Sequence, residues 1–201
     1  MRMRGVWIWV GLFVLAESCR EAGPRRVEIK DEQGRVTQVY YLTPDSMKTD
    51  TERYYDPVTG RNYLEIPYQD GKAQGVQRSF YPSGTVEEEV TMSDGRFHGP
   101  YRTYYPSGQL KSEAKYVDNA LSGLWTSYYE NGQVKERLHF RDNEENGPFV
   151  EYYENGHIKA KGTYKDGDNE DGLLELYDER GQLVRKMQCN MGRCRTVWKR
   201  D

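Results

Sequence analysis

The chain has 201 residues, a net charge of −3 and an isoelectric point near 5.8, values that give no general reason to expect nucleic-acid binding. Only 36% of the residues are hydrophobic and 30% are charged, a balance that is unusual for a thick globular core. The 17 Tyr, 5 Phe and 4 Trp nevertheless argue against disorder, because disordered segments are poor in aromatic residues. Together with the 20 glycines, this composition favours a thin β structure with half-buried strands.

The N-terminal segment, residues 1–19, has the features of a lipoprotein signal peptide. Basic residues precede an apolar run over residues 5–16, which is too short to span a membrane. Ser18 and Cys19 follow directly, and this pair resembles the bacterial lipobox, whose cysteine is acylated and becomes the mature N-terminus. We therefore expect lipidation of Cys19 and attachment to a membrane of the bacterial cell envelope, on its periplasmic or outer surface. An ordinary signal peptide and an uncleaved anchor are the alternatives.

The remaining cysteines, Cys189 and Cys194, are separated by four residues. Outside the cytoplasm such a pair is expected to oxidise, and the short bridge would pin the last turn of the chain. A zinc site at these cysteines would need two further ligands, and the nearest histidine is the distant His157. A disulfide is therefore favoured over zinc.

A period of 24 residues organises most of the chain. Near-identical turn segments end in glycines at this spacing, and aspartates and a second set of glycines keep the same register. Two divergent units precede them, around Gly34 and Gly60, and residues 46–53 are interpreted as a polar insertion. The markers are Gly84, Gly108, Gly132 and Gly156; Asp70, Asp94, Asp118, Asp142 and Asp166; and Gly75, Gly99, Gly123 and Gly147. A fifth unit continues the two glycine series at Gly181 and Gly172, each 25 residues on, so one extra residue falls between Asp166 and Gly172.

Each unit is predicted to be a β-hairpin, because side chains alternate with period two on both sides of a tight turn. In one copy, Leu110, Ser112, Ala114 and Tyr116 share a face of the second strand. A single hairpin is barely stable, so neighbouring units must stack to bury their aromatic columns. The predicted fold is all-β: an elongated array of stacked antiparallel β-hairpins in a single-layer twisted sheet. We expect about 14 strands over residues 27–188 and a length on the order of 70 Å.

The predicted domain organisation has four parts. Residues 1–19 are the lipoprotein signal peptide, and residues 20–59 are a degenerate N-terminal repeat with a linker. Residues 60–188 form the repeat array, and residues 189–201 form a C-terminal cap segment.

The repeated residues resemble the bacterial variant of MORN repeats. The clearest copies begin Gly99-Pro100-Tyr101 and Gly123-Leu124-Trp125, and each continues with a Tyr-Tyr pair and a turn glycine. Proteins of this kind are often grouped as YwqK-type antitoxins, so the resemblance implies an immunity partner for a toxin. The lipobox-like segment is a departure from this family pattern, because a cytoplasmic antitoxin would not carry one.

No catalytic residue, metal site or cofactor is expected. The recurrent aspartates before glycine are explained by turn formation. A calcium loop that begins at Asp166 would require glycine at its sixth position and glutamate at its twelfth, where the sequence has Asp171 and Tyr177, so only a weak, non-specific divalent site is left as an alternative. Of the histidines His98, His139 and His157, the last two have no matching acid or thiol ligands, and no catalytic motif is recognisable. An enzyme is therefore not expected.

Charged residues on the second strands suggest a binding surface. Two positions in successive units change from acidic to basic along the array, ending in Lys135, Arg137, Lys159 and Lys161. We expect these four side chains to share one outward face and to form the binding surface for an acidic protein partner. The alternative is a solvated face without function.

Two function classes follow. The first is a non-enzymatic, membrane-tethered protein that mediates protein–protein interaction in the cell envelope, with a toxin among the candidate partners and no nucleic acid. The second is a structural or lipid-surface element of the envelope, which the negative net charge disfavours against anionic lipid.

Overall fold

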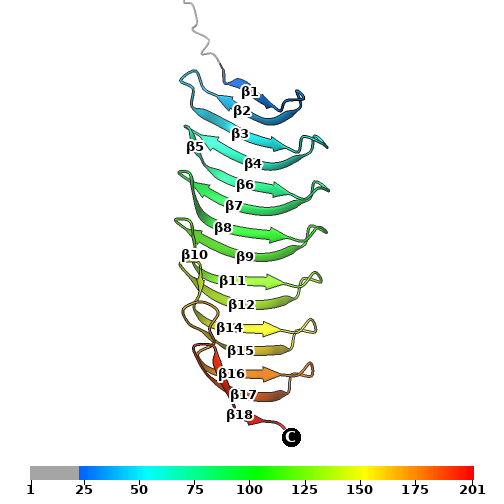
Figure 1. The fold of residues 1–201 in the computed structure, drawn as a ribbon, viewed down its shortest axis with the longest axis vertical. Coiled ribbons are helices and arrows are strands. Elements are labelled where there is room, and N and C mark those ends of the chain that lie inside the picture. The colour runs from blue at the N-terminus through cyan, green and yellow to red at the C-terminus, as the bar shows by residue number, and fades with distance from the viewer. Residues whose placement is uncertain (1–22) are drawn as a thin grey trace, which may run out of the picture.

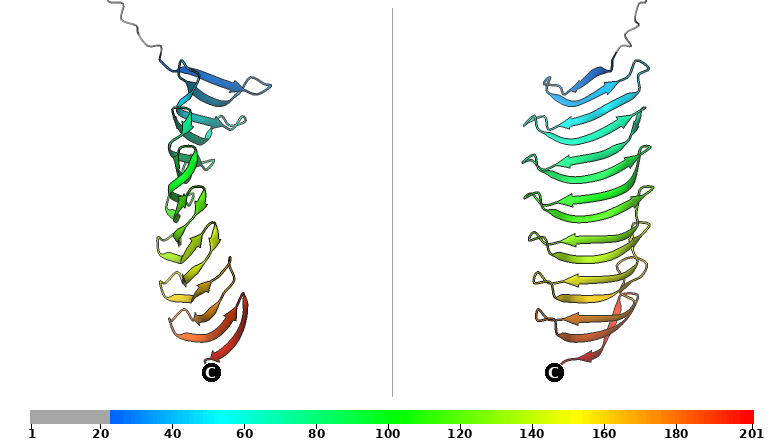
Figure 2. Two further views of the ribbon diagram at one scale, coloured as in Figure 1. Left: turned by 90° about the vertical axis from the view of Figure 1, so that its left-hand side faces the viewer. Right: turned by 180° about the vertical axis from the view of Figure 1, so that it is seen from behind.

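The computed structural model describes residues 23–201, which form one open sheet of 18 strands paired antiparallel (Figure 1). The strands are stacked along the long axis of an elongated molecule, and the stack twists from one end to the other (Figure 2). The described residues contain no helix, and none that could cross a membrane was found in that part of the chain. The prediction of an all-β array of stacked hairpins is confirmed.

Strand pairing extends beyond the predicted range at both ends, and three of the strands are only two residues long. The strands are β1 (Arg25–Lys30), β2 (Val36–Leu42), β3 (Lys48–Tyr55), β4 (Asn62–Gln69), β5 (Lys72–Ala73), β6 (Gly75–Phe80), β7 (Val86–Ser93), β8 (Arg96–Tyr104), β9 (Leu110–Val117), β10 (Ala120–Leu121), β11 (Gly123–Tyr128), β12 (Val134–Arg141), β13 (Glu144–Glu145), β14 (Gly147–Tyr152), β15 (Ile158–Tyr164), β16 (Gly172–Tyr177), β17 (Leu183–Asn190) and β18 (Arg193–Lys199).

A tight turn closes each regular hairpin. Between β6 and β7, the Gly84 N–H donates to the Tyr81 carbonyl oxygen at 2.8 Å. Gly84 adopts φ +91°, a left-handed conformation that favours glycine. At the other ends of the strands, where one hairpin connects to the next, the aspartates of the connecting turns also have positive φ, for example 49° at Asp94. The predicted turn roles of both residue types are confirmed.

A β-bulge follows the turn in every hairpin from β1–β2 to β16–β17. In the hairpin of β11 and β12, Ser127 pairs with Glu136 and Tyr128 pairs with Val134, so Lys135 has no residue opposite it. A bulge changes the face to which the extra residue points, and the simple alternation of side chains fails at that position. The bulged residues are Thr37, Tyr63, Glu87, Lys111, Lys135, Lys159 and Val184.

Tyrosine hydroxyl groups bind neighbouring hairpins together. The second tyrosine of the repeated pair donates to a backbone carbonyl oxygen of the next unit, at 2.7–2.8 Å in each case. These bonds lie beside the turns and repeat along the stack, so each unit is tied to its successor at the same place. The donor and acceptor residues are Tyr81 to Tyr104, Tyr105 to Tyr128, Tyr129 to Tyr152, and Tyr153 to Tyr177.

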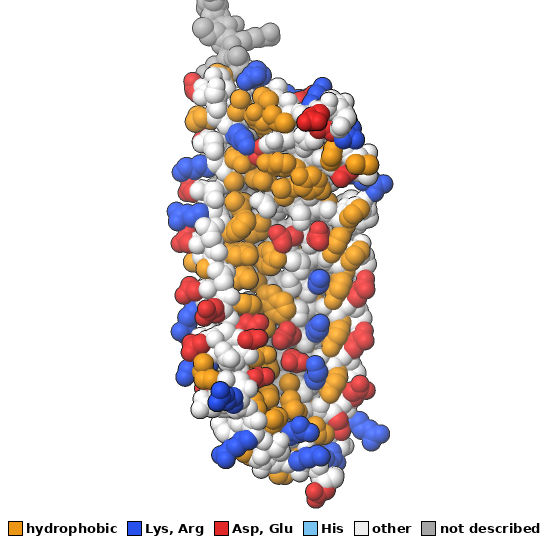
Figure 3. Space-filling model, in the orientation of Figure 1, with side chains coloured by type: hydrophobic (Ala, Val, Ile, Leu, Met, Phe, Trp, Pro, Cys, Tyr) orange, Lys and Arg blue, Asp and Glu red, His pale blue; other side chains and the backbone are white. Residues whose placement is uncertain are grey.

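The main buried cluster lies in the C-terminal half of the sheet. It consists of Leu138, Phe149, Ala160, Leu174 and Cys189, with partly buried aromatic residues around it. The face that carries this cluster is called the apolar face below. Hydrophobic side chains form a band along the length of the molecule in the view of Figure 3. Stacking thus supplies a continuous core that no single hairpin could form.

The segment interpreted as a polar insertion, residues 46–53, is not an insertion. Most of it belongs to β3, which pairs with both β2 and β4. Its polar residues misled the interpretation because Glu52 is buried, with 1% of its surface exposed. The Lys48 ammonium lies 2.7 Å from the Glu52 carboxylate and within about 5 Å of the Tyr40 and Tyr68 ring centroids, so the buried charge is neutralised.

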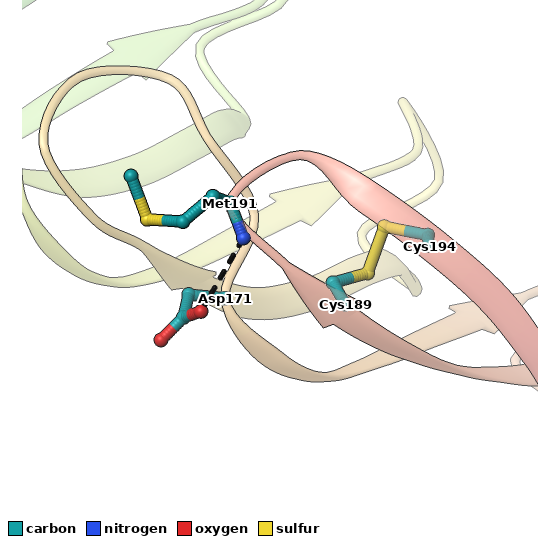
Figure 4. The surroundings of a disulfide bond; sticks show 4 residues. All are labelled: Asp171, Cys189, Met191 and Cys194. Atoms are coloured by element: carbon teal, nitrogen blue, oxygen red, sulfur yellow. Dashed lines mark hydrogen bonds between the residues drawn. A yellow bond between two sulfur atoms is a disulfide. The ribbon is translucent and has the colours of Figure 1, made fainter.

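The C-terminal segment continues the sheet. In the structure Cys189 and Cys194 form a disulfide between facing residues of β17 and β18, and their Cα atoms are 4.0 Å apart (Figure 4). The proposed boundary between residues 188 and 189 falls inside β17, and residues 193–199 form the last strand of the array. Cys19 and the predicted signal peptide lie outside the described residues.

Candidate functional site

A row of mostly charged side chains crosses the sheet from β3 to β17 on the face opposite the apolar face. Strand partners lie on the same face of a sheet, so the register places one residue of each long strand between β3 and β17 in this row. Acidic and basic residues alternate over much of its length, and we call the row the charge ladder. In spatial order it contains Arg53, Glu65, Arg78, Glu89, Arg102, Glu113, Thr126, Arg137, Val150, Lys161, Glu175 and Lys186.

The predicted change from acid to base along the array is not a feature of the folded surface. The acidic residues of the second strands alternate with arginines from the first strands, which the sequence comparison of equivalent positions did not include. Arg78 Nε donates to Glu89 Oε1 at 2.9 Å, and Arg53 makes the same contact with Glu65 at 3.0 Å. The N-terminal half of the ladder is therefore neutralised by ion pairs.

The four predicted binding residues do not share one face. Arg137 and Lys161 lie in the charge ladder, whereas Lys135 and Lys159 are bulged residues. Lys159 donates to Glu151 at 2.7 Å, and Glu151 pairs with Ala160 of the apolar face. The expectation of a single outward surface is wrong because the bulge reverses the direction of the side chain that precedes Glu136 or Ala160.

The C-terminal end of the ladder carries an excess of positive charge. Arg137 is flanked by uncharged Thr126 and Val150, while Lys161 and Lys186 share a single carboxylate, Glu175. Beyond them, Arg195 pairs with Gln188 and extends the same face. We call the following set the basic surface: Arg137, Lys161, Lys186, Arg193 and Arg195. Among residues 23–201, Arg137, Arg193 and Arg195 form no ion pair.

The Glu175 carboxylate is held ionised by its surroundings. Hydrogen bonds from Lys161 and Lys186, at 2.7 and 2.8 Å, lower its pKa to about 2. Tyr177 donates a further hydrogen bond at 2.9 Å. Glu175 therefore fixes two of the five cations in place at neutral pH and leaves the basic surface with a net positive charge.

Two open hollows border the basic surface. The larger, about 750 Å³, lies where the β17–β18 hairpin meets the loop before β16, and Arg193 and Arg195 line it together with Asp171 and Gln188. The smaller, about 300 Å³, is lined by Lys161, Leu173 and other residues of β14 to β16. Leu173 is 48% exposed. Exposed apolar area beside unpaired cations is a combination suited to binding another macromolecule.

The three histidines contribute to local structure. His139 and His157 each contact a backbone carbonyl oxygen through Nδ1, at 3.2 and 2.8 Å, and His98 lies 3.6 Å from the Asp118 carboxylate. Within residues 23–201 no group of three or more potential metal-ligating side chains was found.

Sequence reasoning missed three members of the basic surface, Lys186, Arg193 and Arg195. Lys186 follows the turn glycine Gly181 by five residues, as Lys161 follows Gly156, but the comparison of equivalent positions ended one unit earlier. The two arginines lie in the segment treated as a cap. Their positions follow from pairing β16, β17 and β18 in register. The signal that could have found them is the chain's last period-two run, which continues past Cys189.

Comparisons with known proteins identify the repeats. The MORN repeat variant family matches four consecutive segments, residues 73–94, 97–118, 121–142 and 145–166. Each match starts within two residues of the beginning of the first strand of a hairpin and ends in the next connecting turn. A comparison with curated proteins gave no match.

Solved structures with similarity to the chain include larger assemblies. A GtfA/B complex bound to UDP and GlcNAc is 14% identical, with 63% of this chain and 24% of that chain covered and a TM-score of 0.27. The TcdB2-TccC3-TEV structure is 12% identical, with 87% and 10% covered and a TM-score of 0.26. TcdB2-TccC3-Cdc42 is 13% identical, with 82% and 12% covered and a TM-score of 0.24.

The chain spans a quarter or less of the length of these solved chains. The family match, the 24-residue period and the stacked hairpins agree with one another over residues 73–166. This protein carries four MORN-variant repeats in a stacked β-hairpin array of the kind used for binding or interaction.

Proposed function

We propose that the protein is a non-enzymatic interaction protein that binds an acidic protein partner through its basic surface. The observation that carries the proposal is the imbalance at the C-terminal end of the charge ladder. There, two of the five cations, Lys161 and Lys186, share the carboxylate of Glu175, and the other three form no ion pair within the described residues. Elsewhere in the ladder Arg53 and Arg78 are neutralised, so the excess charge is local and gives the sheet one preferred binding region.

The finer part of the proposal is that the protein is tethered to the bacterial cell envelope by lipid on Cys19. An immunity role against a toxin is the function implied by the antitoxin resemblance of the repeats. The apolar run and the Ser18-Cys19 pair support lipid attachment. A stiff array would then hold the basic surface at a distance from the membrane, with the C-terminal hairpins farthest along the chain from the anchor.

Replacing Cys19 by alanine tests the anchor. We expect the wild-type protein in the membrane fraction and the variant in the soluble fraction, because the acylated residue supplies the hydrophobic attachment. Mass spectrometry of the wild-type N-terminus should show an acyl mass on Cys19. Cleavage at another residue without an acyl mass would contradict this part of the proposal.

Reversing three charges tests the binding surface. In the full-length protein, Arg137, Arg193 and Arg195 are replaced together by glutamate, and the partner is captured from envelope extract and identified. We expect the association rate with that partner to fall about tenfold or more and to lose most of its dependence on salt, because electrostatic steering is removed. Surface plasmon resonance at several ionic strengths measures both quantities.

The matched control reverses Lys111, Lys115 and Lys135, which changes the net charge by the same amount. These residues lie outside the basic surface, so the association rate should stay within about twofold of wild type. Equal rates for the two triple variants would contradict the proposed surface. Binding of the wild type to anionic vesicles instead of a protein would favour the lipid-surface alternative.

A further inference from the structure

The last strand, β18, has one open edge. Within the described part of the chain it pairs with β17 alone, and it forms the C-terminal end of the stack in Figure 1. The two-residue turn at Met191 and Gly192 has positive φ at both positions, 48° and 77°. In this turn type the flanking residues form a hydrogen-bonded pair, so alternate residues beyond it, Cys194 and Thr196, direct their backbone N–H and C=O groups away from β17.

The side chains of β18 leave positive charge uncompensated along this edge. Arg193, Arg195 and Lys199 are exposed, and none of them forms an ion pair in the structure of residues 23–201. The other edge strand, β1, differs because its Arg26 and Lys30 both contact Glu28. Negative charge on an occupant is therefore favoured at the β18 edge, whereas two of the three cations of β1 already contact Glu28.

The hairpin that presents this edge is held in place. The disulfide joins β18 to β17 near the turn, and the turn itself is hydrogen-bonded to the loop between β15 and β16 (Figure 4). The Gly192 N–H donates to the Glu170 carbonyl oxygen at 2.9 Å, and the Met191 N–H to Asp171 Oδ1 at 3.4 Å. A fixed edge lowers the entropic cost of adding another strand to it.

We infer that β18 accepts an extended acidic segment of the partner protein, which adds to the sheet as a further strand. This inference rests on the proposed function and specifies how the partner binds. Main-chain hydrogen bonds to Cys194 and Thr196 would supply affinity. Arg193 and Arg195 project from one face, two residues apart, and match acidic side chains at alternate positions of the incoming strand.

A second copy of the chain does not fit this edge. Two β18 strands paired with each other would bring their arginines and lysines together. Pairing of β18 with β1 of another copy would oppose it to a strand with a net positive charge, because β1 carries three cations and a single carboxylate, Glu28. Like charges facing each other across a strand pair are destabilising, so the charges that attract an acidic segment also disfavour self-assembly.

The test uses a labelled seven-residue peptide of alternating glutamate and valine, added to the full-length protein in detergent with its disulfide intact. We expect saturable binding by fluorescence anisotropy and at least tenfold slower hydrogen exchange at the Cys194 and Thr196 amides. A peptide of the same sequence with N-methylated backbone amides should bind at least tenfold more weakly, because it keeps the charges but cannot form the strand pairing.

A protein variant provides the complementary evidence. Thr196→Pro removes the outward N–H and should weaken binding of the unmodified peptide at least tenfold, while Thr196→Ala should bind like wild type. Because the N-methylated peptide tests the same bonds on wild-type protein, the inference stays falsifiable even if the proline variant does not fold.

The outcomes separate the inference from the proposed function. Equal binding of the two peptides, or no slowing of exchange in β18, would overturn strand addition and leave the basic surface untouched. Equal partner binding by the two triple charge variants would overturn the proposed function itself. Protection of Cys194 and Thr196 by dimerisation without peptide would assign the edge to a second copy and also overturn the inference.

Discussion

Replacing Phe149 with alanine is expected to lower the free energy of unfolding by about 3–5 kcal/mol. The Phe149 side chain is 3% exposed and lies in the main buried cluster. Its ring stacks on that of Tyr164 with the centroids 4.1 Å apart. It also covers Gly162, where a Cβ atom would be only 2.8 Å from the ring. Alanine would therefore leave a cavity. The neighbouring strands can fill it only in part, because backbone hydrogen bonds hold them in the sheet.

Urea denaturation followed by tryptophan fluorescence and circular dichroism measures this loss. The control is Leu124→Ala, because Leu124 is 49% exposed on the opposite face and its truncation creates no cavity. We expect the control to cost less than about 1 kcal/mol. A similar loss for both variants would mean that Phe149 is not part of a cooperative core.

The period of the chain was sufficient to predict the architecture. Turn glycines such as Gly84 and turn aspartates such as Asp94 are required by local backbone conformation, so their recurrence directly reports where hairpins begin and end. The alternation of side chains identified the strands, because successive residues of a strand point to opposite faces of the sheet. Both signals are local in sequence, and the stack repeats them without a change in topology.

The functional surface could not be predicted from the same signals. Lys135 follows the alternating pattern in the sequence, but its bulge depends on how β12 pairs with β11 and turns the side chain toward the other face. The neutralisation of Glu89 by Arg78 likewise depends on strand register. The neighbours of a charged side chain on a sheet are known only after the strands are aligned, because each strand contributes one member to a cross-strand row.

Buried polar residues were a second source of error. Glu52 reads as a surface residue in a polar segment, yet its carboxylate is enclosed and paired with Lys48. Composition alone does not distinguish a solvated glutamate from a buried one such as Glu52, which pairs with Lys48 four residues earlier on the same strand. The result was a strand, β3, interpreted as an insertion.

Deletion of residues 119–142 is expected to give a folded, shorter array. This segment is one full period, and its removal joins Asp118 to Asn143, which then takes the place of Asn119. Both asparagines have φ 69° and both are preceded by an aspartate with positive φ, so the new junction keeps the original turn. Two long strands are lost, and the molecule should shorten by about 10 Å.

The reason for this tolerance is that each unit contacts chiefly its neighbours. After the deletion, β9 would pair with β14 in place of β11, and the tyrosine bonds between units would re-form, with Tyr105 donating to the carbonyl oxygen of Tyr152. Circular dichroism should show the same β signature, and small-angle scattering should report the shortening.

A twelve-residue deletion, residues 131–142, provides the contrast. It removes β12 alone and joins the end of β11 to the start of the unit at Asn143. The following strands would then have to run in the opposite direction or present their charged face to the core. We expect this variant to aggregate or to lose its cooperative unfolding transition. If the twelve-residue deletion were tolerated as well as the full period, the hairpin would not be the unit of stability.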